Sequence, residues 1–109
     1  MSAHKAVVIE VNGQRRHIDV DGLDDLQAAV GGNIEGVRIR ELPNVYVFVN
    51  EEGKFTAPAN ETATQLVKPD IQPGDFVAGP ALVTGFDNET GETVDLDPLD
   101  WAELLGRRA

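Results

Sequence analysis

The stretch "KAVVIEVNGQRRHIDV", Lys5 to Val20, is the part of this chain that most directly indicates its fold. An apolar, β-branched run leads into Asn12-Gly13, and this dipeptide between two strand-like runs is the strongest short signal for a β-hairpin. After the turn, apolar and charged residues alternate, with His17 on the charged face, as in a strand that is buried on one side. We therefore predict an antiparallel N-terminal hairpin over residues 5–20.

A helix and two strands are expected next. Apolar residues recur at helical spacing from Leu23 to Val30, and the following glycine pair can end that helix in a left-handed cap. Within residues 34–42 the apolar residues shift from even-numbered to odd-numbered positions, which we interpret as a strand with a bulge at Gly36. The run 44–50, "NVYVFVN", is apolar on both faces and is predicted to be a central strand.

The second half of the chain continues with short elements. We expect a turn over 51–54 with Gly53 at positive φ, and a strand that resumes at Phe55. Asn60 or Thr62 can cap a helix over 61–68. Two strands separated by a Gly-Pro break are expected over 74–87, followed by a turn and an edge strand in "TVDL".

Together these elements predict the order β-β-α-β-β-α-β-β-α in one domain that comprises residues 1–109. Because hairpins dominate, the fold class is α+β, with a mostly antiparallel sheet and two or three short helices. The last helix, over residues 97–107, is acidic and amphipathic, and Pro98 suits its first position.

The net charge of −10, from 9 basic and 19 acidic residues, limits the partners of this protein. A phosphate backbone repels such a surface, so we expect no direct binding of nucleic acid. The charge can serve solubility, can steer the chain toward a basic protein, or can imitate DNA with rows of carboxylates. These three interpretations remain open at this point.

Catalysis is not expected. The chain has no cysteine, its one serine is Ser2, and its two histidines, His4 and His17, lie near the terminus and on an exposed strand position. No metal-binding or phosphate-binding motif is present, so neither a metal nor a cofactor is expected. No membrane span or signal peptide is expected either, which favours the cytoplasm.

The C-terminal part offers a candidate partner surface. From Asp87 to Glu103 the chain has seven acidic residues and no basic one, and an aromatic residue and leucines follow within one short helix. Such a helix can enter a basic-rimmed apolar groove of another protein. Alternatively, the helix packs its tryptophan against its own sheet. The candidate partner-binding residues are Asp95, Asp97, Asp100, Trp101, Glu103 and Leu104.

An ordered set of short motifs lies within residues 20–80. It comprises Gly31, Gly32, Ile34 and Glu35, then Asn50 to Lys54, then Asn60, Ala63 and Thr64, then Gly74 and Asp75. In the pattern Gly-Gly-x-Ile-Glu, Asn-Glu-Glu-Gly-Lys, Asn-x-x-Ala-Thr and Gly-Asp, this set resembles a small domain family of unknown function found in phages, plasmids and other mobile elements.

The resemblance implies an accessory protein of a bacterial host's mobile element that acts by binding. One hypothesis is an inhibitor or modulator that binds a host protein with a basic surface, with DNA mimicry as a special case. The alternative is a protein that binds a small, nucleotide-like molecule, and a purely structural domain is a further alternative. A homodimer is a possible arrangement in the second case. The candidate ligand-binding residues are Glu35, Asn50, Glu51, Asn60 and Thr64.

Overall fold

A computed structural model describes residues 3–106 of the chain. Its centre is one sheet in which every neighbouring pair of strands is antiparallel, in the order β2-β1-β5-β4-β3, and the short β6 pairs with the end of β5. The strands are β1 (His4–Ile9), β2 (Arg15–Val20), β3 (Ile34–Arg38), β4 (Val45–Asn50), β5 (Ala81–Phe86) and β6 (Thr93–Val94). The two long edges of the sheet are therefore β2 and β3.

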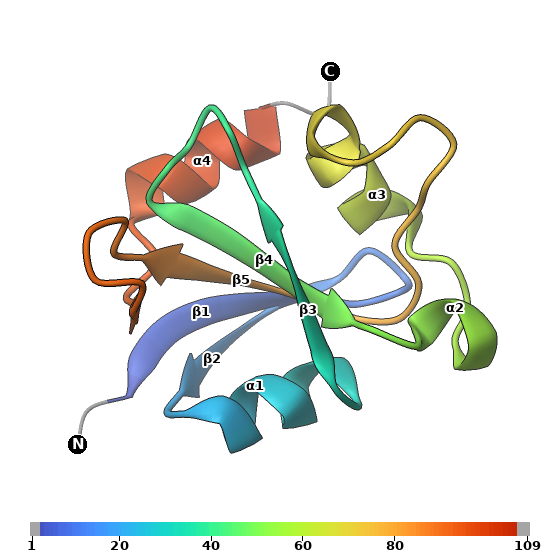
Figure 1. The fold of residues 1–109 in the computed structure, drawn as a ribbon, viewed down its shortest axis with the longest axis horizontal. Helices are drawn as coiled ribbons and strands as arrows, with labels where there is room; N and C mark the ends of the chain where they lie inside the picture. Colours follow the sequence, from blue (N-terminus) through green and yellow to red (C-terminus); the bar gives the residue numbers. More distant parts are fainter. Residues whose placement is uncertain (1–2, 107–109) are drawn as a thin grey trace.

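Helices cover both faces of the sheet, as Figure 1 shows. Helix α1 (Leu23–Val30) lies below the sheet in that view, and α3 (Glu61–Val67) and α4 (Pro98–Gly106) lie above it. The short α2 (Gly53–Thr56) lies beyond the end of β4, and a 3₁₀ helix, η1 (Lys68–Asp70), continues α3. The α+β class and the predicted order of elements are confirmed, with α2 as an additional helix.

Alternation along the strands produces two hydrophobic cores. Val47 and Val83 face α3 and α4, and their cluster includes Leu66 of α3 and Leu104 of α4. The next residue of each strand, such as Phe48 in β4, faces the opposite way, toward Leu26 and Val30 of α1. Burying one such side chain contributes about 1.5–3 kcal/mol, so both helical layers are held mainly by apolar contacts.

Several local predictions are confirmed. Gly13 in the first hairpin has a φ of 90°, and Gly31 ends α1 in the left-handed conformation. Asn60 caps α3, and β4 is interior because it lies between β3 and β5. As an interior strand β4 cannot pair with a second subunit. His4, which the sequence places near a terminus, lies within β1.

Three local predictions are wrong. Gly36 forms no bulge, because β3 pairs with β4 in one unbroken register. Residues 53–56 form α2 rather than a turn and a strand, and Gly53 is not at positive φ. A glycine is needed at position 53 because a Cβ there would lie 2.6 Å from the carbonyl oxygen of Ala78. Residues 74–79 form no strand, and only one isolated bridge joins Ala59 to Ala78.

Candidate functional site

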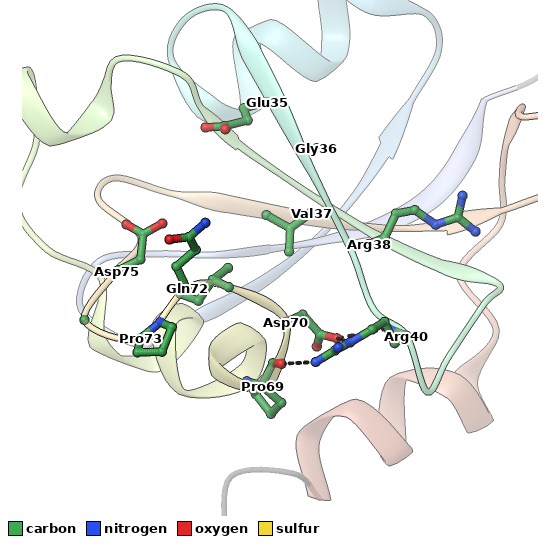
Figure 2. Close-up of a pocket in the computed structure, with 12 residues that line it drawn as sticks. Glu35, Gly36, Val37, Arg38, Arg40, Pro69, Asp70, Gln72, Pro73 and Asp75 are labelled. Atoms are coloured by element: carbon green, nitrogen blue, oxygen red, sulfur yellow. Dashed lines mark hydrogen bonds and ion pairs between the residues drawn. The ribbon is translucent and has the colours of Figure 1, made fainter.

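A large open groove of about 940 Å³ lies in the described part of the chain. Figure 2 shows that β3 forms one wall and that the chain after α3 forms the other. The β3 wall contains consecutive residues, Glu35 to Arg38, and the opposite wall contains residues 69–75. Because successive side chains of a strand point to opposite faces, a groove lined by consecutive residues follows the edge of the strand itself.

The edge that faces this groove has backbone groups that no strand of the described residues uses. The carbonyl of Asn33 accepts a 2.8 Å hydrogen bond from Glu51 N–H, which identifies residues 33, 35 and 37 as those bonded to β4. Antiparallel pairs alternate between bonded and non-bonded residues. The N–H and C=O groups of Ile34, Gly36 and Arg38 therefore point away from β4, toward the open side.

Gly36 lets an aromatic ring lie directly against the strand. A Cβ at this position would lie 2.4 Å from the hydroxyl oxygen of Tyr46. Tyr46 in turn stacks on Phe86, with ring centroids 4.9 Å apart, and meets Phe48 edge to face. Arg38 lies over the Phe86 ring at 5.5 Å and donates a 2.8 Å hydrogen bond to Asn88 Oδ1. These contacts hold β3 in place from its α1 side.

Two ion pairs fix the opposite wall. Arg40 donates to the nearly buried carboxylate of Asp70 through its backbone N–H at 3.0 Å and its Nε at 3.4 Å, and its guanidinium also bonds the carbonyl of Pro69. Lys54 forms an ion pair with Asp75. The Lys54 hydrogen bond, together with the backbone N–H of Phe76, lowers the pKa of Asp75 below its usual value.

A smaller pocket of about 130 Å³ opens at the Glu35 end of the groove. Its apolar lining includes Val37 and Ile71, together with two aromatic side chains that are unusually exposed, Phe55 at 87% and Phe76 at 42%. Glu35 and Glu51 are exposed residues that also line it. Neither carboxylate forms a hydrogen bond or ion pair with the described residues.

The structure brings together three of the five predicted ligand-binding residues. Glu35, Asn50 and Glu51 all line this pocket. The Asn50 side chain is already engaged, because its amide donates to the Val30 carbonyl at 3.3 Å and its oxygen accepts from Glu52 N–H at 2.8 Å. Lys54 also lines the pocket but is paired with Asp75, so the unpaired charged groups of the pocket are the carboxylates of Glu35 and Glu51.

Asn60 and Thr64 have structural roles instead. Asn60 is fully buried, and its side-chain amide donates to the carbonyls of Ile9 at 3.0 Å and Gly79 at 2.9 Å. Its side-chain oxygen accepts from Ala63 N–H, which is the cap of α3. The Thr64 hydroxyl donates to the Asn60 carbonyl and accepts from Val77 N–H. These hydrogen bonds leave Asn60 unavailable to a ligand.

The six predicted partner-binding residues divide in the same way. Leu104 is fully buried, and Trp101 is half-buried against the core, so α4 packs on its own sheet. Asp97 caps α4 by accepting from Leu99 N–H at 2.7 Å, yet it remains exposed. Asp95 accepts from Lys5 N–H at 2.9 Å and lies 3.5 Å from His4. Asp95, Asp97 and Glu103 are exposed, and Asp100 is partly exposed.

Sequence reasoning missed the aromatic part of the site. Phe55 was expected in a strand and Phe76 in another strand, where alternation would bury a large side chain. No local pattern identifies them as exposed. Glu35 and Glu51 were found through the resemblance, but the groove between them and residues 69–75 depends on how distant segments pack.

Comparison with known proteins gives one match. The family model described as "Domain of unknown function (DUF3846)" matches residues 4–107, which is nearly the whole chain. This chain belongs to the DUF3846 family. The match extends well beyond the motif-bearing residues 20–80, and it includes the first hairpin and α4. No curated protein and no solved structure matches the chain.

Two further features bear on the chemistry of this DUF3846 domain. Among residues 3–106, no three histidine or acidic side chains lie close enough together to hold a metal ion. Within the same residues, no helix has the length and apolar character needed to cross a membrane.

Proposed function

We propose that this DUF3846 protein acts by binding a protein with a basic surface and does not catalyse a reaction. The observation that carries the proposal is the acidic segment, residues 87–103, which lies at the surface from the β5–β6 turn through α4. Within the described residues its carboxylates form no ion pair with a lysine or arginine side chain, and only the side chain of His4 lies beside one of them. Unneutralised charge of one sign raises the rate of encounter with an opposite charge.

The acidic segment also carries an apolar contact point. Leu99 is 78% exposed on the first turn of α4, between Asp97 and Asp100. Protein interfaces combine an apolar centre with a polar rim. A single exposed leucine is ordinary on a protein surface, so the support for a protein partner comes from its position among the carboxylates of α4.

Binding of a nucleotide-like molecule has less support. The pocket beside Asn50 has a volume of about 130 Å³, well below the roughly 300–1,000 Å³ of ordinary ligand pockets. Its unpaired polar groups, Glu35 and Glu51, are carboxylates and would repel a phosphate. Imitation of DNA is a special case of this protein-binding proposal. A second special case is that the chain is the product of a mobile element and binds a protein of its bacterial host in the cytoplasm.

The test is affinity capture from a lysate of the source organism at low and high salt. We expect a basic protein to be retained at low salt and released at high salt, because exposed charges are screened. The bait variant is Asp97→Asn with Glu103→Gln, since Asn can still cap α4. The matched control, Asp19→Asn with Glu61→Gln, removes the same charge elsewhere. Equal retention by both double variants and the unmodified protein would contradict the proposed surface.

A further inference from the structure

We propose that the open edge of β3 receives an extended, basic segment of the partner as an additional strand. This inference rests on the proposed function and specifies how part of the partner would be held. The groove follows that edge, and the outward N–H and C=O groups of Ile34, Gly36 and Arg38 face it. Main-chain hydrogen bonds to such an edge supply affinity in strand addition, and side-chain pockets supply specificity.

The length of the edge suits a short segment. Strand β3 contains five residues, which corresponds to about 17 Å of extended chain. The groove is open and has a volume of about 940 Å³, and its wall over residues 69–75 is held by the Arg40–Asp70 and Lys54–Asp75 ion pairs. A segment laid along β3 would therefore lie between two preformed walls.

The unpaired charges at the Glu35 end of the groove favour a basic segment. The cationic residues of the lining already have partners: Arg40 pairs with Asp70, Lys54 pairs with Asp75, and Arg38 bonds Asn88. The pocket at the Glu35 end matches one long side chain: Val37, Ile71 and Phe76 can contact an aliphatic stem, and Glu35 and Glu51 can bind a cationic head. Lysine and arginine have this combination of apolar stem and charged tip. An acidic or purely apolar side chain would leave both carboxylates without a partner.

The groove is continuous with the acidic segment. At the other end of β3, Arg38 bonds Asn88, which belongs to the acidic segment. A basic strand that follows β3 from Glu35 to Arg38 would thus emerge beside the acidic surface. A second copy of this chain is disfavoured as the occupant, because pairing would bring together two molecules that each carry a net charge of −10.

The probe is a short peptide of alternating lysine and valine, compared with the same peptide in which glutamate replaces lysine. We follow amide hydrogen exchange of the full chain by NMR. At about ten times the dissociation constant, exchange at the Gly36 and Arg38 amides should slow about tenfold, because only the free fraction exchanges. The glutamate peptide should give no protection. Equal protection by both peptides would overturn the charge argument.

A pair of variants tests the main-chain bonds. Arg38→Ala and Arg38→Pro both remove the side chain, but only proline also removes the outward N–H. Edge strands accept proline where the N–H faces solvent, and urea unfolding checks that both variants fold. We expect the proline variant to bind the lysine peptide roughly threefold to tenfold more weakly than the alanine variant, the value of one hydrogen bond. Equal affinities would overturn strand addition.

The pocket has its own control. Glu35→Gln with Glu51→Gln should weaken the lysine peptide by roughly fivefold, as expected for two exposed ion pairs. The equally charged variant Asp19→Asn with Glu61→Gln should change the affinity less than about twofold, since these side chains line neither the groove nor the pocket and lie outside the acidic segment. Equal weakening by both variants would indicate nonspecific attraction and overturn the proposed pocket.

The two proposals fail separately. If the lysine peptide leaves the β3 amides unprotected while salt-sensitive capture persists, strand addition is wrong and the acidic partner surface stands. If capture fails but the peptide protects β3, the acidic segment is not the partner surface. Protection of the β3 amides in the free protein, accompanied by dimers in sedimentation, would identify a second copy as the occupant and overturn the inference.

Discussion

Replacement of Asn60 by alanine should destabilise the fold severely. This side chain is fully buried and links three parts of the molecule. Its amide donates to the last residue of β1 and to Gly79 before β5, and its oxygen caps α3. Alanine would leave two carbonyls and one N–H buried without these partners. A buried polar group that loses its partner costs about 1–3 kcal/mol, and loss of an N-cap costs about 0.5–2 kcal/mol.

These contributions are not additive, so we expect a total loss of about 3–5 kcal/mol. That is a large part of the roughly 5–15 kcal/mol by which domains are stable. The variant Asn60→Asp should be destabilised as well at neutral pH, because it keeps the capping oxygen but turns a second oxygen toward the carbonyls of Ile9 and Gly79.

Urea unfolding followed by circular dichroism measures the change. The matched control is Asn44→Ala, because Asn44 is exposed and, among residues 3–106, forms a hydrogen bond through its backbone carbonyl and none through its side chain. Its free energy of unfolding should change by less than about 0.5 kcal/mol. A loss below about 1 kcal/mol at Asn60, with an unchanged m value, would refute the structural role assigned to this side chain.

Three further predictions concern single positions. Thr84→Val should stabilise the protein by about 1 kcal/mol in urea unfolding, because the buried Thr84 hydroxyl has no hydrogen-bond partner among the described residues; a loss of stability would contradict this. Gly53→Ala should lower the melting temperature, because the new Cβ would meet the Ala78 carbonyl. The control is Gly74→Ala, because a Cβ there meets no atom within 4 Å and the substitution therefore measures only the cost of an alanine at positive φ. The lowered pKa of Asp75 means that its stabilisation is present above the unfolded-state pKa and disappears as the pH falls through the folded-state pKa. The stability difference between the unmodified protein and Asp75→Asn should therefore shrink below about pH 4, and a constant difference would argue against the Lys54 contact.

Local signals in the sequence were sufficient for much of the fold. Asn12-Gly13 fixes a hairpin because few other residues adopt the required turn, and Asn60 before an apolar helix is a strong cap signal. Gly53 was misread because a glycine required by close packing looks the same in sequence as a glycine required by positive φ. That distinction depends on Ala78, which is distant in the chain.

The candidate site was only partly predictable for a similar reason. Glu35 lies in β3 and Glu51 directly follows the adjacent β4, as the predicted strands and turn placed them. The open edge, however, exists because β5 enters the sheet between β1 and β4 and leaves β3 outermost. No local pattern encodes this insertion. The exposure of Phe55 and Phe76 likewise follows from the docking of residues 68–78 against the sheet.

The central place of β5 has a consequence for the order in which the chain can fold. The β1–β2 and β3–β4 hairpins need only local contacts and can form early during synthesis, but no strand pairing joins them until residues 81–86 have been made. Long-range pairing of this kind is slow. Until it occurs, β1 and β4 each present an uncovered apolar edge of the type that promotes aggregation. A chain that ends before Ala81 would thus contain two hairpins that no strand joins, rather than a smaller domain.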